Sequence, residues 1–405
     1  MASAKTSSSS STTLSWLLTS AGASEAAASS ILGSLAAADT DDPWPPAMEE
    51  RYERLERVGQ GVFGRVYRAW DRAEGLAVAV KHLTGRGGGL YVHTGVPDFA
   101  REAMSLRACQ GHPAVVELRA TFADHRRSDG DSFLVMELVG TMNLRAYMVR
   151  RRLSRRPFRE AEVRGIMRQL LAGVEWSHRA GVLHRDVKPE NVLVNDGSGD
   201  DTRSPADGQK ERKEKKPAGE ITYKICDYGM SEPMALPPEK TKREYSPLAT
   251  TCEYRAPELF LGSTDYDGRI DSWGLGCIMA ELLAGAGGRA LFDGRGKTGK
   301  EVLASMLDTV GARGIKEWPG MCHLAWRHPE EARWVRGFRD DGRLRKMFPA
   351  RVLSEEGFDV LSGLLDSSPR RRLTAAAALK MPWFTDDRRR RRRGFGACFK
   401  SCVTD

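Results

Sequence analysis

Paired cysteines, long apolar runs and a large excess of one charge are all missing from this sequence of 405 residues. Its seven cysteines are scattered, and none belongs to a Cys-x-x-Cys pair. This argues against a zinc site or a disulfide framework, and we interpret the cysteines as reduced thiols of an intracellular protein. The most apolar stretch, 273–286, contains Glu281 and follows Asp271, so we predict no membrane span.

The net charge of +9 does not by itself indicate a nucleic-acid partner. The run Arg388–Arg393 carries six of the positive charges, so the rest of the chain is only mildly basic. This run fits a nuclear localisation signal, a nucleic-acid patch or a solvated tail equally well. Cys398 and Cys402 permit a lipid anchor, although Thr404 and Asp405 do not suit a prenylation box. We expect no nucleic-acid binding by the body of the protein.

The composition and the hydrophobic pattern of the sequence change along the chain. Residues 1–48 are rich in Ser and Ala and poor in aromatics, which predicts disorder. A transit peptide is the alternative, but no arginine precedes Arg51 and Glu25 intervenes. We predict an α+β fold with a small β-rich lobe at 52–140 and a larger, mainly helical lobe at 141–384. A charged insert at 196–220 is predicted to be a disordered loop between two strands, and 385–405 forms an Arg-rich tail.

A glycine-rich segment lies between two strand-like stretches near the start of the β-rich lobe. It reads Gly59-Gln60-Gly61-Val62-Phe63-Gly64. Because strands flank it on both sides, a hairpin turn is predicted and a Rossmann site is disfavoured. Glycines let backbone amides approach phosphate groups closely, although a purely structural hairpin is the simpler interpretation of the motif alone. About twenty residues on, an apolar run ends at Lys81, and the two features together are much more specific.

Three further motifs follow in order along the chain. They are His184-Arg185-Asp186-Val187-Lys188-Pro189-Glu190-Asn191, Asp227-Tyr228-Gly229 and Ala256-Pro257-Glu258. With the glycine-rich turn and the lysine strand, they make the chain resemble eukaryotic protein kinases of the serine/threonine type, from about Tyr52 to Phe384. The resemblance implies the two-lobed protein kinase fold, with one main helix in the β-rich lobe. It also implies ATP and Mg²⁺ as cofactors.

The resemblance assigns roles to individual residues. Lys81 is the cation for the phosphates of ATP, and Glu102 holds that lysine in place. Asp186 receives or orients the proton of the substrate hydroxyl, and Lys188 contacts the transferred phosphate. Asn191 and Asp227 hold magnesium. The remaining nucleotide-binding residues are those of the glycine-rich segment together with Val66, Ala79, the gatekeeper Met136, and Glu137 and Val139 of the hinge.

Two other residues are predicted to be structural. Asp271 resembles the residue that braces the catalytic loop, and Arg372 resembles the partner of Glu258. Lys188 is typical of kinases that phosphorylate Ser or Thr, so the partners are protein substrates with those acceptors.

Several segments resemble the cyclin-dependent-kinase-like (CMGC) group. They are Tyr254-Arg255-Ala256-Pro257-Glu258, Leu291-Phe292, Trp318-Pro319-Gly320, and Gly95-Val96-Pro97 leading to Arg101-Glu102. The resemblance implies a preference for Ser or Thr followed by Pro. Ala100, however, stands where the group has the isoleucine that docks a cyclin, which argues against cyclin dependence.

The resemblance also suggests how activity is controlled. Kinases with an arginine before the catalytic aspartate, here Arg185, usually need a phosphate on the activation segment. Ser246 falls at the activating position, which implies an upstream activating kinase. The simpler alternative is that Ser246 is one exposed serine among many. Thr251 matches the residue that hydrogen-bonds the catalytic aspartate in relatives.

The sequence therefore predicts a serine/threonine protein kinase of the nucleus, the cytoplasm or both. The alternatives are a pseudokinase scaffold or regulatory nucleotide-binding module, which the variant Asp227-Tyr228-Gly229 motif leaves open, and a nucleic-acid-binding protein acting through its arginine tail.

Overall fold

The computed structural model describes residues 44–61, 64–83, 98–123, 131–140, 142–197, 220–234, 251–285 and 289–385. The chain divides into two compact units, Met1–Arg51 and Tyr52–Asp405. In the first unit, α3 spans Pro46–Arg51. Pro46 opens this helix because its fixed φ suits the first helical position and its missing N–H is not needed there. The segment that we predicted to be disordered up to residue 48 thus ends in a helix, and residues 1–43 lie outside the described part.

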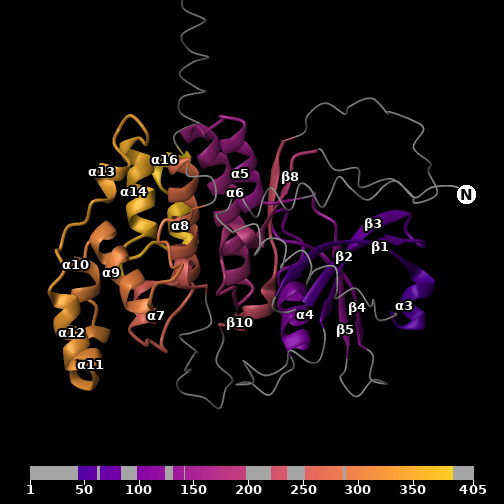
Figure 1. Ribbon diagram of the computed structural model, residues 1–405, viewed down its shortest axis with the longest axis horizontal. Coiled ribbons are helices and arrows are strands. Elements are labelled where there is room, and N and C mark those ends of the chain that lie inside the picture. The colour runs from indigo at the N-terminus through magenta and orange to yellow at the C-terminus, as the bar shows by residue number, and fades with distance from the viewer. Residues whose placement is uncertain are drawn as a thin grey trace, which may run out of the picture. The chain divides into compact units, whose positions relative to one another are not determined.

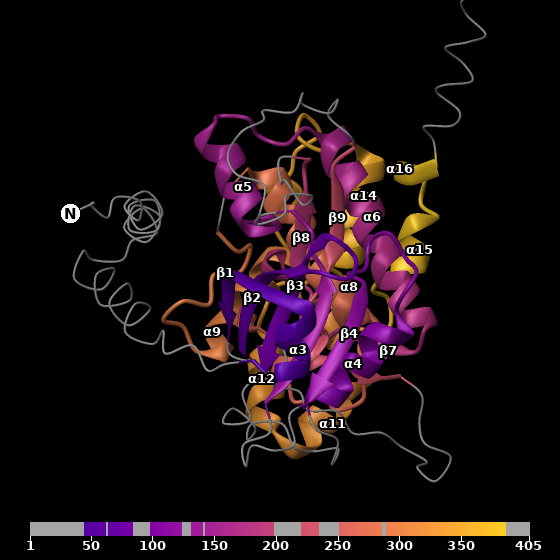
Figure 2. The ribbon, with the colours of Figure 1, turned by 90° about the vertical axis from the view of Figure 1, so that its right-hand side faces the viewer.

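A five-stranded antiparallel sheet forms the β-rich part of the second unit, in the order β1-β2-β3-β5-β4. The strands are β1 (Tyr52–Gly61), β2 (Gly64–Asp71), β3 (Leu76–Leu83), β4 (Leu118–Ala123) and β5 (Ser132–Glu137). Gly61 pairs with Gly64, so the predicted hairpin is present. Its tip, Val62 and Phe63, lies outside the described residues. Helix α4 (Asp98–Ala108) packs on β4 and β5, and Figure 2 shows it beside β4.

The register of this sheet gathers the predicted nucleotide-binding side chains on one face. In antiparallel pairs, directly opposed residues share a face. Val66 pairs with both Gly59 and Lys81, and Ala79 pairs with Met136. Val78 and Val80 alternate with these positions and are fully buried on the other face.

The helical part of the second unit lies to the left of the five-stranded sheet in Figure 1. Its helices are α5 (Leu144–Leu153), α6 (Glu160–Arg179), α7 (Pro257–Phe260), α8 (Arg269–Ala284), α9 (Gly299–Val310), α10 (Arg313–Lys316), α11 (Gly320–Arg327), α12 (Pro329–Arg336), α13 (Leu344–Met347), α14 (Glu355–Leu364), α15 (Ala375–Leu379) and α16 (Pro382–Thr385). The apolar positions that predicted α6 are all buried: Val163, Ile166, Met167, Leu170, Leu171 and Val174. Helix α8, against which α6 and α14 pack, is buried almost throughout.

Short strands lie next to the segments that contain Asp186 and Asp227. They are β6 (Met142–Asn143), β7 (Val182–Leu183), β8 (Val192–Asn195), β9 (Thr222–Ile225) and β10 (Glu232–Pro233). The antiparallel pairing of β8 with β9 places a strand on each side of the charged insert, as predicted, although residues 198–219 of the insert lie outside the description. Among the described residues, no helix is both long and apolar enough to cross a bilayer.

Candidate active site

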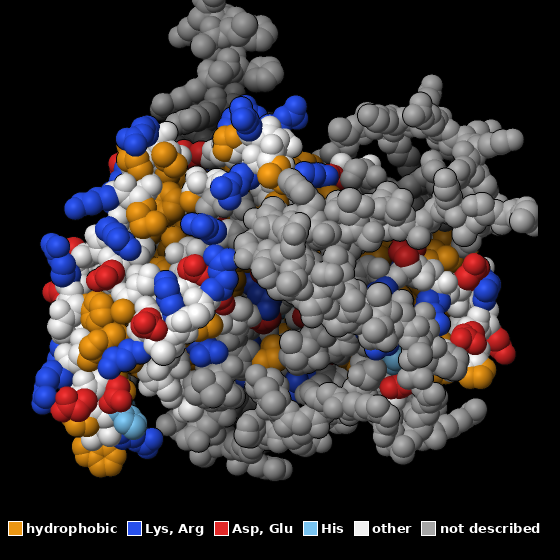
Figure 3. Space-filling model, in the orientation of Figure 1, with side chains coloured by type: hydrophobic (Ala, Val, Ile, Leu, Met, Phe, Trp, Pro, Cys, Tyr) orange, Lys and Arg blue, Asp and Glu red, His pale blue; other side chains and the backbone are white. Residues whose placement is uncertain are grey.

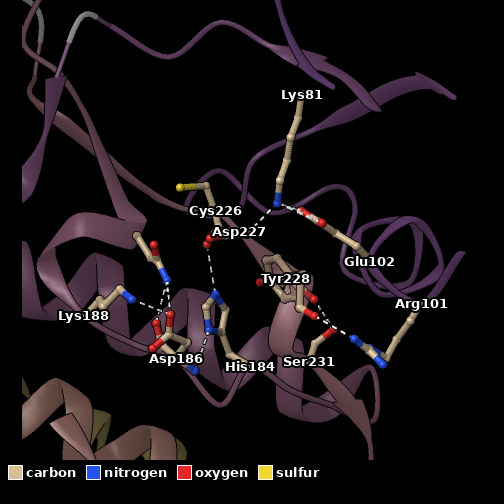
Figure 4. Close-up of polar contacts among 12 residues, drawn as sticks. Lys81, Arg101, Glu102, His184, Asp186, Lys188, Cys226, Asp227, Tyr228 and Ser231 are labelled. Carbon is tan, nitrogen blue, oxygen red and sulfur yellow. Dashed lines mark hydrogen bonds and ion pairs between the residues drawn. The ribbon is translucent and has the colours of Figure 1, made fainter. Parts of the chain in front are cut away.

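Three charged side chains from three different segments meet at the centre of the site (Figure 4). The Nζ atom of Lys81, on β3, lies 2.7 and 2.9 Å from the two carboxylate oxygens of Glu102 on α4. The same Nζ lies 2.7 Å from Oδ1 of Asp227, which follows β9. Lys81 and Glu102 are buried. The ion pair predicted from the sequence is therefore formed, and Asp227 joins it.

The electrostatics of this triad reflect one cation facing two acids. Burial lowers the pKa of Lys81, but the charges of Asp227 and Glu102 outweigh it and the pKa is raised. Burial raises the pKa of Glu102, and Lys81 offsets this only in part. Burial also acts to raise the pKa of Asp227, yet the lysine charge prevails and the pKa is lowered. Asp227 is thus held as a carboxylate, the form that binds a divalent cation.

The backbone at Asp227 takes a left-handed conformation with φ of 63°, which is uncommon for a non-glycine residue. It leads into the one-turn helix η3 (Tyr228–Met230). Tyr228 is fully buried, and its hydroxyl lies 2.8 Å from Ser177 Oγ. From α4, Arg101 Nη2 donates to the Gly229 carbonyl at 2.9 Å. The turn is therefore fastened to both α6 and α4.

The Asp186 carboxylate accepts hydrogen bonds from three side chains in and near the catalytic loop, which is the segment 184–191. Its Oδ2 accepts from Lys188 Nζ at 2.6 Å and from Asn191 Nδ2 at 3.0 Å. Its Oδ1 accepts from Thr251 Oγ1 at 2.6 Å, and Lys188 Nζ also donates to that hydroxyl at 2.7 Å. The predicted contact between Thr251 and the catalytic aspartate is thus present. These bonds orient the Asp186 carboxylate between a lysine and a hydroxyl.

The buried carboxylate of Asp271 holds the backbone of this loop in place. Asp271, at the start of α8, accepts the backbone N–H of His184 at 3.0 Å and that of Arg185 at 2.8 Å, and it lies 2.8 Å from His178 Nε2. Burial raises the pKa of Asp271, but the bond to His178 and the nearby histidines lower it overall. The bracing role predicted for Asp271 has this physical basis.

His184 links the loop to the segment before Asp227. Its Nε2 lies 3.0 Å from the Cys226 carbonyl, which can only accept, so Nε2 carries the proton. Its Nδ1 then accepts the N–H of Asp186 at 3.2 Å. The ring therefore joins the two segments that bear Asp186 and Asp227.

The other predicted nucleotide residues lie where the sheet register brings them. Gly64 has φ of 143°, and a Cβ there would lie 2.0 Å from the His82 carbonyl oxygen, so only glycine fits. Val139 is buried. The Glu137 carboxylate accepts from Lys224 Nζ at 2.5 Å and from the Glu117 N–H at 2.9 Å, and the Glu137 N–H donates to the Glu117 carbonyl at 3.0 Å. Val62, Phe63 and Ser246 lie outside the described residues.

The predicted structural pair of Arg372 with Glu258 is also present. Two guanidinium nitrogens of Arg372 each lie 2.7 Å from one carboxylate oxygen of Glu258, and both side chains are almost fully buried.

Two ionic contacts near the site were not predicted. Arg185 pairs with Glu232 at 3.5 Å, and Arg145 pairs with Glu281 at 2.6 Å, in reach of the Tyr254 hydroxyl. The partners lie 47 and 136 positions apart, so neither pair has the spacing of a sequence motif.

A groove of about 350 Å³ adjoins the catalytic loop. Lys188 and Thr251 line it beside Glu190 and Glu253, with Arg145, Asp293 and Arg295 on its other walls. Two of the residues that bond Asp186, Lys188 and Thr251, thus line this groove.

The site defines a phosphotransferase, and comparison with known proteins gives its family. The protein kinase domain model matches residues 52–384, so the chain belongs to the protein kinase family. The putative cyclin-dependent kinase F-2 of Oryza sativa subsp. japonica is 46% identical over 341 residues, which are 83% of this chain and 90% of the relative. A cell division control protein 2 homolog 3 of Trypanosoma brucei brucei is 30% identical over 345 residues, 83% of this chain and 93% of the relative.

Cyclin-dependent kinase G-2 of Oryza sativa subsp. indica is 35% identical over 357 residues, 86% of this chain but 44% of that relative. The chain thus spans less than half the length of this longer relative. Together these findings identify a serine/threonine protein kinase of the cyclin-dependent-kinase-like group, with ATP and a divalent metal ion as the family's requirements. They give no support to the pseudokinase alternative.

Proposed function

We propose that the chain transfers the γ-phosphate of ATP to Ser or Thr of protein substrates, with Asp186 as the catalytic base. The observation that carries this is the Asp186 carboxylate, which Lys188, Asn191 and Thr251 hold in one orientation beside an open groove. A carboxylate so oriented can receive the proton of the substrate hydroxyl. Lys188 and Thr251 then flank the hydroxyl that reacts.

Asn191 and Asp227 would hold Mg²⁺, which neutralises phosphate charge when bound. Asn191 uses Nδ2 to donate to Asp186, so Oδ1 is its atom available to a metal. Mg²⁺ binds one or two protein oxygens and completes its shell with phosphates and water. This agrees with the described residues, which contain no self-sufficient cluster of acids, histidines and cysteines. Lys81 would contact the phosphates, and Gly59, Gln60, Gly61 and Gly64 would approach them through the backbone.

The direct test uses the purified chain, labelled ATP, Mg²⁺ and a Ser/Thr peptide library. We expect phosphorylated peptide from the wild type and none from Asp186→Asn. Magnesium-dependent ATP binding without any phosphotransfer would instead favour a nucleotide-binding scaffold.

We further propose that the acceptor is followed by proline. Arg255 matches the arginine that, in related kinases, supports a conformation whose carbonyl a substrate amide cannot satisfy; proline lacks that amide and loses nothing. Peptides that differ only in Ser-Pro and Ser-Ala test this. We expect a clear preference for Ser-Pro, and equal rates would refute it.

Cyclin binding is not needed in this proposal. Ala100 replaces the isoleucine that anchors a cyclin in relatives, and Lys81 already meets Glu102 in the single chain. Addition of a cyclin panel to the purified kinase should leave its rate unchanged, whereas a hundredfold rise would overturn this part.

For localisation we propose the nucleus, the cytoplasm or both, with Arg388–Arg393 as the nuclear signal. On the face drawn in Figure 3, Lys and Arg side chains of the described residues are scattered among Asp and Glu, which does not favour a nucleic-acid surface there. A fluorescent fusion in which these arginines become alanine should lose nuclear enrichment; unchanged enrichment would argue against a signal.

A further inference from the structure

Arg185 is a cation buried directly beside the catalytic aspartate. Only 4% of its side chain is exposed, and its backbone φ is 66°. Its Nε donates to the Met230 carbonyl at 2.6 Å, and its Nη1 lies 3.3 Å from the Tyr266 hydroxyl. Neither contact is negatively charged. A buried guanidinium needs a counter-charge, because desolvation is costly and its pKa is too high for it to become neutral.

Glu232 supplies that counter-charge. Its Oε1 lies 3.5 Å from Arg185 Nη2, and 13% of its side chain is exposed. Among the described residues, Glu232 is the acid whose carboxylate lies within ion-pair distance of this guanidinium. The role that an activation-segment phosphate plays for such an arginine is thus filled by a residue of the chain itself.

The backbone holds Glu232 at this position. It belongs to β10, and it pairs directly with Leu183 of β7, which leads straight into His184 and Arg185. On its other side, Ser231 Oγ donates to Ser105 Oγ of α4 at 2.8 Å. The carboxylate therefore sits where the catalytic loop, the Asp227 turn and α4 come together.

We propose that Glu232 is a positioning residue that neutralises Arg185 and orders the catalytic loop without a phosphate on Ser246. A phosphate brought to Arg185 would also face the Glu232 carboxylate, and this like-charge repulsion reduces what phosphorylation can add. The inference rests on the proposed kinase activity. We therefore expect the kinase to be active without a phosphate on Ser246.

The first test compares phosphatase-treated wild type with Glu232→Gln, which keeps the shape and removes the charge. We expect kcat to fall about tenfold to a hundredfold, while the KM for ATP stays within about threefold, because the change misplaces the loop and not the nucleotide. Glu232→Asp should recover part of the loss. Glu330→Gln, which removes a carboxylate from an exposed pair with Arg333, is the matched control and should be unchanged.

The second test varies Ser246. We expect the kcat of Ser246→Ala and that of phosphatase-treated wild type to agree within about threefold. Phosphoserine placed at 246 should raise the kcat of Glu232→Gln far more than the kcat of wild type. The inference is overturned if unphosphorylated wild type is inactive and phosphoserine 246 activates it, or if Glu232→Gln keeps full kcat. If Glu232→Gln does not fold, Ser246→Ala in the native background decides the question. Absence of phosphotransfer from wild type with phosphoserine 246 would overturn the proposed kinase activity itself, and this inference with it.

Discussion

Two buried ionic contacts in this kinase have similar distances but differ in their balance of charge. Arg372 meets Glu258 through two parallel bonds, and it also donates to the carbonyls of Asp366 and Arg269 while lying over the Trp273 ring. Lys81 instead faces two carboxylates at once. The first pair is balanced in charge and closed by hydrogen bonds. The second carries an excess of negative charge.

The difference separates architecture from chemistry. A balanced pair that is almost fully buried is out of reach of a ligand, so it fixes the geometry of α7 against the segment before α15. An unbalanced cluster whose second carboxylate, that of Asp227, is partly exposed is suited to receive a metal ion, because the charge of the ion would compensate that carboxylate. The comparison therefore predicts that changes to Lys81 and its carboxylates affect turnover, whereas changes to Arg372 and Glu258 affect the stability of the fold.

The largest effect is expected from the unbalanced cluster. Asp227→Asn and Lys81→Met should each lower the rate of phosphotransfer about a thousandfold or more, because they remove the proposed contacts to the metal ion and the phosphates. The fold should survive: burial raises the pKa of Glu102, so this acid can take up a proton once Lys81 is gone. Kinase assays and melting temperatures measured side by side check this, with exposed Asp308→Asn as the unchanged control. Substantial activity in Asp227→Asn would remove the magnesium assignment.

The closed pair should show the reverse. Arg372→Met leaves Glu258 buried without its partner, which we expect to cost about 3–5 kcal/mol in the free energy of unfolding. The double variant Glu258→Leu with Arg372→Met removes both charges and should recover much of that loss. Urea unfolding of the two single variants and the double variant measures the coupling. Additive losses would show that the pair is not a unit, and the contrast drawn above would fail.

How much of this could be predicted from the sequence depends on the separation of the partners. Lys81, Asp186, Asn191 and Asp227 lie in motifs whose members are only a few residues apart, so the sequence alone singles out each of them as a candidate site residue. Helix α6 followed from its apolar period. The fold itself was evident from the order of these motifs.

Long-range contacts of residues outside the family's motifs could not be predicted in the same way. The partnership of Arg185 with Glu232, and that of Arg145 with Glu281, depends on how distant segments pack, and neither acid has a distinctive local pattern. The start of α3 was also missed, because six residues are too few for a periodic signal.

Thr251 gives an intermediate case, since it touches the catalytic aspartate without carrying charge. Thr251→Val keeps the shape but removes the hydroxyl that bonds Asp186 and Lys188. A hydrogen bond to a charged group contributes about 1.5–3 kcal/mol, so we expect kcat to fall about tenfold to a hundredfold. Thr251→Ser retains the hydroxyl and should stay within about threefold of wild type. Equal turnover by the valine variant would mean that Lys188 and Asn191 alone orient Asp186.

The smallest effect is expected at Glu160, a partly exposed acid that joins α6 to the far end of the helical part. Its Oε1 accepts from Ser354 Oγ at 2.6 Å and from Trp383 Nε1 at 2.7 Å. Burial acts to raise the pKa of Glu160, but the bonds from Ser354 and Trp383 prevail and lower it below its ordinary value of 4.5. A carboxylate with a lowered pKa stabilises the fold above that ordinary value, and the contribution is lost as the pH falls through its pKa in the folded state.

Glu160→Gln should therefore cost about 1 kcal/mol at pH 7 and less as the medium becomes acidic. Urea unfolding of wild type and variant at a series of pH values checks this, with exposed Glu331→Gln as the control that should show no such convergence. Because Glu160 binds Ser354 and Trp383 and no residue of the catalytic loop, kcat should not change. A difference in unfolding free energy that stays constant with pH would mean that the loss comes from packing and not from the charge of Glu160.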